Sequence, residues 1–267
     1  MARDNESAQA EVTRRIPITT KPDGYFDVPI ETEGHKPRTW LLGACRAVIV
    51  PLCKLLFRLE SRGFENVPKD GAGPVLFVAN HVSYFDPVAL WAAAMPLNTR
   101  FLARANLWRV PIFRGMISRM GSIPVEPESA DIKAIKRAAA ILKRGESACI
   151  FAEGTRMRTP DKVYKPHAGF VLIANMGKAK IVPVGITGTE RIRPYNKPFL
   201  RFPKITVTFG EAIDIADYKA LPKDERTKTI VSDTMTAVFA LRDSADPSPI
   251  RPGLPPYGEV AEEYLPH

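Results

Sequence analysis

Short apolar runs alternate with segments of helical periodicity through the middle of the chain, and this alternation restricts the folds that the sequence can adopt. Six runs have the length and composition of buried strands, at residues 75–79, 100–103, 122–125, 148–151, 181–186 and 205–209. Four segments repeat apolar residues at helical spacing, at residues 87–94, 130–143, 169–176 and 223–243. Strands that alternate with helices are typical of an α/β fold with a largely parallel central sheet flanked by helices. In such folds, functional side chains gather in the loops that follow the strands.

The two ends of the chain lack this alternation. Residues 1–37 are rich in charge, proline and threonine, which predicts a flexible arm, and they contain no apolar core of a secretory signal. Residues 244–267 are rich in proline and predict an irregular tail. The segment 61–243 is long enough to form one domain with its own hydrophobic core.

The chain carries 38 Lys and Arg residues against 29 Asp and Glu residues, a formal net charge of +9. A basic surplus of this size suits an anionic partner, which can be nucleic acid, a membrane surface or a phosphorylated substrate. The sequence has no zinc-finger or RNP-type motif, which argues against nucleic acid. Its three cysteines have no CxxC spacing, which argues against a disulfide framework and favours a reducing compartment.

The strongest apolar run, residues 41–57, is interrupted by charge. A membrane-spanning helix needs about 20 apolar residues, and a charge near its centre costs roughly 2.5–3.5 kcal/mol. At about 100° per residue, Arg46, Lys54 and Arg58 share an arc of about 120°. This pattern predicts that residues 38–60 lie in a membrane interface with their basic side toward the headgroups. The alternative is a helix packed on the protein's own core with its basic stripe in water.

Histidine is the side chain best suited to proton transfer near neutral pH, and two of the four histidines lie outside the predicted domain. Because His35 and His267 fall in the arm and the tail, a histidine-dependent reaction must use His81 or His167. The sequence lacks GxGxxG, GxxxxGK[ST], GxSxG and HExxH motifs, so the nucleotide sites, nucleophile elbow and zinc protease that they mark have no support.

His81 lies just beyond the apolar run 75–79, and Asp86 follows shortly after it, directly before Pro87. On one continuous helix the two side chains would point about 140° apart. They can meet if His81 lies in a turn and Asp86 opens the next helix, where proline is favoured in the first turn. The Asp86 carboxylate then accepts the Nδ1 proton, and Nε2 is free to take a proton from a substrate hydroxyl.

Each of these residues also has a simpler interpretation. Asp before Pro is an ordinary helix N-cap, and a histidine at a strand end is often a polar residue satisfied by its neighbours. The sequence leaves both interpretations open. Loss of activity in Asp86→Asn with an unchanged melting temperature would favour the catalytic role.

A second group of polar residues follows the apolar run 148–151, in the segment Glu153-Gly154-Thr155-Arg156. Gly154 permits backbone conformations that other residues resist, which indicates a turn. Arg156 can bind a phosphate through two parallel hydrogen bonds, and Glu153 can bond a substrate hydroxyl or hold Arg156. The alternative is a Glu–Arg pair on the surface of a turn.

These residues form motifs that resemble those of a known enzyme family. NHVSYFD at 80–86 resembles the NHxxxxD block of the glycerolipid acyltransferases, and FAEGTR at 151–156 resembles their FPEGTR block. GSIPV at 121–125 is similar to the glycine-initiated second block, and IVPVGI at 181–186 to the VPVxI strand. The resemblance covers roughly residues 70–212, and NHxxxxD followed by EGTR is a specific combination. It is closest to the bacterial lysophospholipid acyltransferases of the 1-acyl-glycerol-3-phosphate acyltransferase type.

The resemblance implies that His81 deprotonates the free hydroxyl of a lysophospholipid, which attacks the thioester of acyl-CoA or acyl-carrier protein. It implies that Asp86 orients His81 and stabilises its charge. It assigns acceptor binding to Glu153, Gly154, Thr155, Arg156 and Arg104, the last from the FLARANL stretch. It implies no metal and no bound cofactor. It also implies that residues 61–243 form an acyltransferase domain on the cytoplasmic face of an anionic membrane.

One departure from the family pattern concerns the acceptor. The second block often ends in an arginine that contacts the acceptor phosphate, whereas this chain has Glu126-Pro127. Either other basic residues take over, or the acceptor differs from lysophosphatidic acid, and glycerol-3-phosphate or another lysolipid is then the alternative within the class. The basic residues that fit the first possibility are Arg104, Arg156, Lys133 and Arg137.

Two functions of other classes remain open. In a metal-dependent hydrolase, His81, Asp86 and His167 would bind a metal ion that activates water, although HxxxxD is not a common ligand spacing on a helix. A non-catalytic module would use the basic surface only to bind anionic membranes. Retained activity in chelator excludes the first function, and turnover of a lysolipid with an acyl thioester excludes the second.

Overall fold

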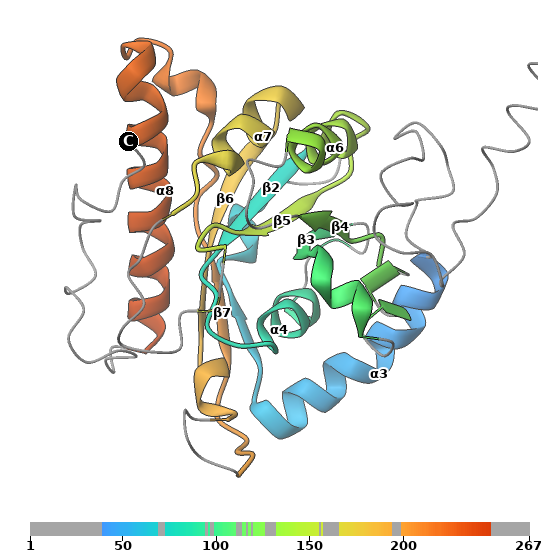
Figure 1. The fold of residues 1–267 in the computed structure, drawn as a ribbon. Helices are drawn as coiled ribbons and strands as arrows, with labels where there is room; N and C mark the ends of the chain where they lie inside the picture. The colour runs from blue at the N-terminus through green and yellow to red at the C-terminus, as the bar shows by residue number, and fades with distance from the viewer. Residues whose placement is uncertain are drawn as a thin grey trace, which may run out of the picture.

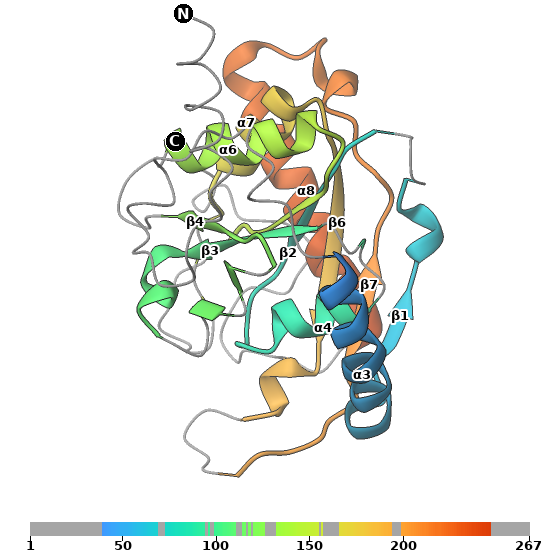
Figure 2. The same cartoon turned by 90° about the vertical axis from the view of Figure 1, so that its right-hand side faces the viewer.

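The computed structural model describes residues 39–246, apart from 69–72, 94–95, 97–98, 111–113, 116, 119, 126–131, 155, 157–165 and 194–198. Within this part of the chain, seven strands form one sheet in the order β1-β7-β6-β2-β5-β3-β4 (Figures 1 and 2). The strands are β1 (Glu60–Arg62), β2 (Val75–Ala79), β3 (Arg100–Arg104), β4 (Ile123–Val125), β5 (Ala148–Phe151), β6 (Lys180–Thr187) and β7 (Thr206–Phe209). Neighbouring strands are parallel except for the pair β6 and β7, which confirms the largely parallel sheet.

Helices cover both faces of this sheet (Figure 1). They are α3 (Thr39–Phe57), α4 (Asp86–Ala92), α6 (Ile132–Lys143), α7 (Gly169–Gly177) and α8 (Lys223–Ala245). Strand β2 is buried along its whole length, because Val75, Phe77 and Ala79 face the α3 and α4 side while Leu76 and Val78 face the other helices. Burial on both faces explains why this strand is a continuous apolar run rather than an alternating one.

The predicted strands and helices are confirmed to within two residues at each end. Strand β1 was not predicted, because its sequence Glu-Ser-Arg is polar and its side chains are mostly exposed. It forms by pairing with β7 at the edge of the sheet, a contact between segments far apart in the chain. The predicted tail begins slightly too early, since α8 continues to Ala245. The predicted arm, 1–37, and residues 247–267 lie outside the described residues.

Helix α3 combines features of both predicted alternatives. A narrow stripe containing Leu42, Cys53 and Phe57 is buried against the core, yet only 17% of the apolar window Trp40–Phe57 is buried. By length and composition this window could cross a membrane, which is weak evidence by itself. The predicted basic arc is wrong for Arg58, which follows the end of the helix and has a positive φ of 47°.

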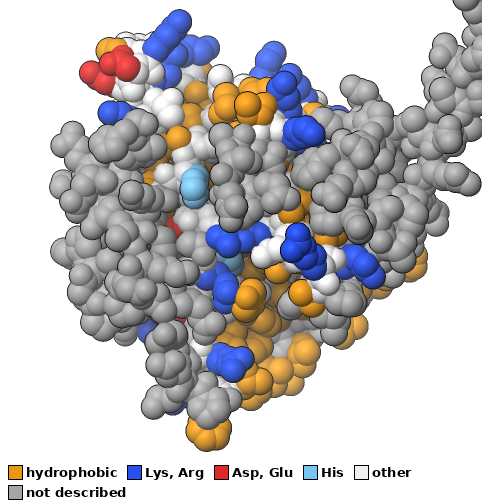
Figure 3. Space-filling model, viewed as in Figure 1, with side chains coloured by type: hydrophobic (Ala, Val, Ile, Leu, Met, Phe, Trp, Pro, Cys, Tyr) orange, Lys and Arg blue, Asp and Glu red, His pale blue; other side chains and the backbone are white. Residues whose placement is uncertain are grey.

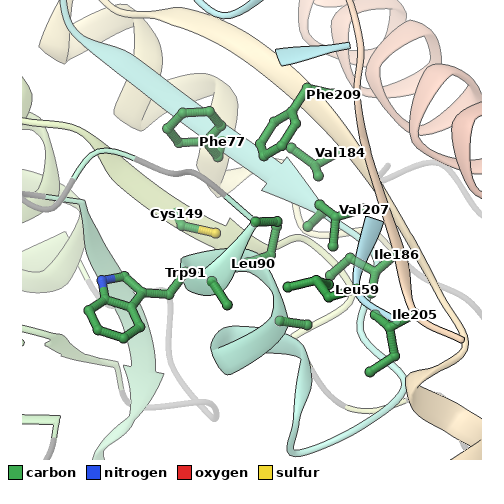
Figure 4. Packing of buried hydrophobic residues seen from close by; sticks show 14 of the residues in the cluster. Leu59, Phe77, Leu90, Trp91, Cys149, Val184, Ile186, Ile205, Val207 and Phe209 are labelled. Carbon is green, nitrogen blue, oxygen red and sulfur yellow. The ribbon is translucent and has the colours of Figure 1, made fainter. Parts of the chain in front are cut away.

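Helix α4 is held on the sheet by its apolar residues (Figure 4). Leu90 is fully buried and Trp91 nearly so, in a cluster with Phe77, Val184 and Phe209 of three neighbouring strands. Complete burial of a leucine side chain stabilises a fold by roughly 1.5–3 kcal/mol. This packing places Asp86, the first residue of α4, at the carboxyl end of β2.

Candidate active site

The polar residues singled out above come together at one edge of the sheet. Strands β6, β2, β5 and β3 are adjacent and parallel, so their carboxyl ends lie side by side. The segments at these ends carry Thr189, His81, Glu153 and Arg104, respectively. The chain leaves β2 toward β3 on one side and later returns to form β6 on the other. Ligands of open α/β sheets bind at such a point, which makes this edge the candidate site.

His81 and Asp86 are in direct contact, as predicted. His81 Nδ1 lies 2.7 Å from Asp86 Oδ2, and the Asp86 side chain is fully buried while 17% of the His81 side chain is exposed. A carboxylate only accepts hydrogen bonds, so Nδ1 carries the proton and the neutral ring keeps a lone pair on Nε2. This tautomer is the one that a general base acting through Nε2 requires.

The Asp86 carboxylate is held by further donors on both oxygens. The backbone N–H groups of Val82 and Ser83 each donate to Oδ2 at 2.7 Å. The hydroxyl of Thr189 donates to Oδ1. Together with His81, four donors fix the position of this fully buried carboxylate.

The helix-cap interpretation of Asp86 is wrong. The N-cap position of α4 is Phe85, and its side chain makes no capping hydrogen bond. Asp86 is already inside the helix, and its carboxylate bonds backbone N–H groups of the preceding turn instead of those of α4. The side chain therefore shapes the turn that carries His81.

The His81 turn is also held from the neighbouring strands. The Asn80 side chain donates to the carbonyl of Ile186 at 3.0 Å and accepts from its N–H at 2.7 Å, which joins the end of β2 to β6. The His81 backbone N–H donates to Glu153 Oε2 at 2.6 Å. The His81 ring stacks on Phe151, with 4.1 Å between ring centroids. Backbone and ring of His81 are thus both positioned by β5 and the turn after it.

The surroundings of Glu153 differ from those expected for a Glu–Arg pair on the surface of a turn. Its side chain is nearly fully buried, so the surface interpretation is wrong. Its bond to the His81 N–H ties the turn after β5 to the turn after β2. Acceptor binding by Glu153 stays a prediction. Arg156 lies over the ring of Tyr84, with 3.4 Å from its Cζ to the ring centroid.

Gly154 and Arg104 meet at the rim of the site. Gly154 has a φ of +61°, and a Cβ there would lie 2.6 Å from Nε2 of His167, so the close approach of that ring requires glycine. The exposed Arg104 donates from Nε and Nη2 to the Gly154 carbonyl, at 3.1 and 2.7 Å. The structure thereby brings Arg104 to the EGTR segment. Thr155, which follows Gly154, lies outside the described residues.

The proposed replacements for the missing arginine differ in accessibility. Residues 126 and 127 lie outside the described residues, so their surroundings are not described. Lys133 is exposed on α6, whereas only 4% of Arg137 is exposed. Arg104 and Arg156, which contact the turns of the site, are better placed than Arg137 to meet an acceptor.

Sequence reasoning missed Thr189 as a residue of this site. Thr189 is fully buried and follows Gly188, whose φ of +94° turns the chain away from the end of β6. A Cβ on Gly188 would lie 2.0 Å from the Lys204 carbonyl oxygen. The sequence signal is a polar residue just beyond a buried strand, here Gly188-Thr189 after β6. The same signal identified His81, and it could have identified Thr189.

A second carboxyl group with buried oxygens, that of Glu190, directly follows Thr189 in the chain. Burial raises the pKa of Glu190, and the negative charge of Asp86 adds to that rise, while Arg191 opposes it. The Arg191 Nε lies 3.2 Å from Glu190 Oε1. Within the described residues, no group of three His, Cys, Asp or Glu side chains is arranged to hold a metal ion, so the geometry gives the hydrolase alternative no support.

Comparison with known proteins gives a matching family and a matching fold. The family model described as Acyltransferase matches residues 58–187, which include both motif-bearing turns. The crystal structure of the 1-acyl-sn-glycerophosphate acyltransferase from Thermotoga maritima superposes with a TM-score of 0.57 at 24% identity, over 77% of this chain and 82% of that one. That likeness shows the fold.

Sequence relatives point the same way. The 1-acyl-sn-glycerol-3-phosphate acyltransferase of Streptococcus pneumoniae is 30% identical over 173 residues, which are 64% of this chain and 61% of that protein. The enzyme of the same name from Bacillus subtilis is 26% identical over 68% of this chain and 87% of that one. The chloroplastic LPAT1 of Arabidopsis thaliana is 29% identical, and the matched segment spans only 38% of its length. Residues 58–187 thus match the Acyltransferase family, and these three curated relatives are named 1-acyl-sn-glycerol-3-phosphate acyltransferases.

Proposed function

We propose that this protein is an O-acyltransferase that moves a fatty acyl group from an acyl thioester to the free hydroxyl of a lysophospholipid, with 1-acyl-glycerol-3-phosphate as the first candidate acceptor. The observation that carries the proposal is the contact between His81 and the fully buried Asp86 at the carboxyl end of β2. The match of residues 58–187 to the Acyltransferase family and the names of the matched relatives support it.

The reaction follows from the position of the imidazole. Nε2 of His81 takes the proton of the acceptor hydroxyl as the oxygen attacks the thioester carbonyl carbon, and Asp86 stabilises the imidazolium that forms. The tetrahedral intermediate then collapses with cleavage of the C–S bond. The proton passes from His81 to the leaving thiolate, so the products are the new ester and a free thiol. No metal ion or bound cofactor takes part in this proposal.

The acceptor phosphate is assigned to the rim of the site. Arg104 and Arg156 lie at the turn after β5 and carry charges suited to a phosphate, which a guanidinium binds through two parallel hydrogen bonds. The donor is acyl-CoA or acyl-carrier protein, and the reaction belongs to phospholipid biosynthesis. Because the acceptor is a lipid and α3 exposes apolar residues, we place the protein on an anionic membrane, at its cytoplasmic face.

The deciding experiment is a matrix of donors and acceptors run on the purified wild type and on His81→Ala. Acyl-CoA and acyl-carrier protein are each combined with lysophosphatidic acid, other lysophospholipids and glycerol-3-phosphate. We expect ester formation with at least one lysophospholipid, and its loss in His81→Ala by a factor of about 10²–10⁴. Lys143→Ala, an exposed change at the end of α6, is the matched control and should keep wild-type activity.

The alternatives predict other outcomes of the same matrix. If only glycerol-3-phosphate is turned over, the proposed acceptor is wrong and the proposed acyl transfer stands. Activity that disappears in chelator would support the metal-dependent hydrolase. Binding of anionic vesicles without turnover of any pair would support the non-catalytic module and contradict the proposal.

A further inference from the structure

The exposed apolar side chains of this protein are unevenly distributed. Twelve large apolar residues are exposed in the described part of the chain, and seven of them lie in two segments, each between 49% and 78% exposed. Four belong to α3 and three to the loop that leads into β7: Trp40, Val48, Leu52, Leu55, Phe199, Leu200 and Phe202. Contiguous exposed apolar surface in a folded protein marks a binding surface.

These two segments are neighbours in space although they are far apart in the sequence. The rings of Phe57, at the end of α3, and Phe202 lie with centroids 5.5 Å apart. Arg58 donates from Nη2 to the Phe202 carbonyl at 3.0 Å, and the Ile205 N–H donates to the Phe57 carbonyl at 2.9 Å. Figures 1 and 2 both place the loop and α3 at the lower end of the molecule. Figure 3 shows apolar surface over this end, with basic side chains around it.

The charges of the two segments have one sign. Residues 40–58 and 199–204 contain no acidic residue in their sequence, and Lys54, Arg58, Arg201 and Lys204 are exposed. Part of this charge is engaged, since Lys204 pairs with Glu60 at 2.6 Å. Exposed apolar side chains surrounded by basic ones match the interface of an anionic bilayer, where the apolar groups enter the acyl boundary and the basic groups meet the headgroups.

We propose that Phe199, Leu200 and Phe202 form a second membrane anchor, which inserts into an anionic bilayer beside the exposed face of α3. The inference rests on the proposed function in one respect, since a lipid acceptor gives the protein a reason to reach the bilayer. A second copy of the chain fits this surface less well, because it would bring two sets of like charges together. The apolar window Trp40–Phe57 of α3 is about 27 Å long. Phe199, Leu200 and Phe202 add apolar side chains at the Phe57 end of this helix.

Tryptophan fluorescence tests the insertion directly, on the full chain and vesicles of phosphatidylcholine with phosphatidylglycerol. Trp91 and Trp108 are buried, whereas Trp40 is exposed on α3, so the variant Trp40→Phe removes the exposed indole and leaves a constant background. With Phe199→Trp added to Trp40→Phe, we expect quenching by brominated lipid. Leu172→Trp in the same background is the matched control, because Leu172 is exposed on α7 at the opposite face of the sheet, and it should not be quenched.

A binding measurement complements the fluorescence. The double variant Phe199→Ser, Leu200→Ser should lower the partition of the protein onto the same vesicles about tenfold, because two apolar groups no longer enter the bilayer. The control Ile132→Ser, exposed on α6, should leave the partition unchanged. If the Phe199→Trp indole is not quenched while Trp40 of the wild type is, α3 docks alone and the second anchor is overturned. A dimer in light scattering that the double variant dissociates would equally overturn it, in favour of self-association.

Failure of the second anchor can be told apart from failure of the proposed acyltransfer. A short-chain lysolipid dissolved below its critical micelle concentration needs no bilayer, so the double variant should turn it over at the wild-type rate. If the indole of the Phe199→Trp variant enters vesicles while the wild type makes no ester, the anchor stands and the acyltransferase function is contradicted. If the wild type makes ester while the indole of the Phe199→Trp variant stays in water, the acyltransferase function stands and the second anchor is contradicted.

Discussion

The turn after β2 and the turn after β5 lie next to each other and differ in how they are built. The first centres on Asp86, which is fully buried and accepts from four donors. The second ends in Arg156, which lies against the exposed ring of Tyr84, and presents Gly154 to the exposed Arg104. The groups proposed for proton transfer are therefore positioned before any substrate arrives, whereas the groups proposed to bind the acceptor lie nearer the surface.

This difference separates two properties of the site. In the proposed mechanism, the reaction type depends on a hydrogen-bond network that tolerates little change, because each removed partner leaves a buried polar group unsatisfied. The proposed choice of acceptor depends instead on the exposed Arg104 and the half-buried Arg156, whose contacts can be replaced one at a time. Substitutions in the two turns should therefore affect different kinetic constants.

The largest effect is expected for Asp86→Asn. Asparagine has the same shape, its Oδ1 can accept the bonds now made to Oδ2, and its amide can donate to the Thr189 hydroxyl, so the fold should survive. The negative charge that stabilises the His81 imidazolium is lost, and kcat should fall about 10²–10⁴-fold. Steady-state kinetics and a melting curve check this together, and kcat within a factor of two of the wild type would remove Asp86 from the mechanism.

Thr189→Val should have the next largest effect. It removes one donor from the Asp86 carboxylate and keeps the shape of the side chain, so we expect kcat to fall roughly tenfold with little change in KM. Thr189→Ser should restore the rate because it restores the hydroxyl.

The last residue of β6, Thr187, offers a matched control for Thr189. The hydroxyl of Thr187 is buried and makes no hydrogen bond, so Thr187→Val tests the cost of the substitution alone. Equal losses of kcat in Thr187→Val and Thr189→Val would show that the strand end, and not the bond to Asp86, determines the rate.

Tyr84→Leu should act on the acceptor side with a smaller effect. It removes the aromatic face over which Arg156 lies, a cation–π contact worth about 0.5–1 kcal/mol at exposed sites, which corresponds to a two- to fivefold rise in KM for a phosphate-bearing acceptor. kcat and the KM of the thioester should not change. Tyr84→Phe keeps the ring and should behave as the wild type, and a loss of kcat in Tyr84→Leu would place this residue with the first turn instead.

The smallest effect is expected for Glu190→Gln, and it concerns stability. Burial raises the pKa of Glu190, so ionisation of this group at neutral pH opposes folding. Because the pKa of Glu190 is higher in the folded protein than in the unfolded chain, the free energy of unfolding falls as the pH rises from the unfolded pKa to the folded pKa. The glutamine variant should therefore melt higher than the wild type at pH 7, by about 2–4 °C for each kcal/mol gained.

The acid range provides the check on this prediction. Below the ordinary pKa of 4.5 the Glu190 carboxyl group is protonated in both states, and the difference in Tm between wild type and Glu190→Gln should vanish. A variant that melts lower than the wild type at pH 7 would mean that the Arg191 ion pair outweighs the cost of burial.

Much of the site could be predicted because its signals are local in the sequence. A histidine beyond a buried run, an aspartate before proline and a Glu-Gly-Thr-Arg segment each follow a strand whose apolar composition is visible without a structure. Parallel strands then force these strand ends to the same edge of the sheet. The predicted meeting of His81 and Asp86 follows from the turn after one strand and the helix that begins at Asp86, and the distance of 2.7 Å confirms it.

The roles of Glu153 and Thr189 could not be predicted in this way. Glu153 bonds the backbone of His81, 72 positions earlier in the chain, and Thr189 bonds Asp86 across 103 positions. Such contacts depend on which strands are neighbours, and no apolar periodicity encodes that order. The sequence pattern also assigned Arg58 to a helix that ends before it.

The sequence by itself determined the class of fold and the strand-end residues, and it made the contact of His81 with Asp86 possible, because periodicity and turn chemistry act over a few residues. Only the tertiary structure decided which strands adjoin β2, and so which side chains hold the carboxylate and the histidine turn. It also decided which side of α3 faces outward and that the 199–202 loop lies at its end, because burial depends on what the rest of the chain leaves uncovered.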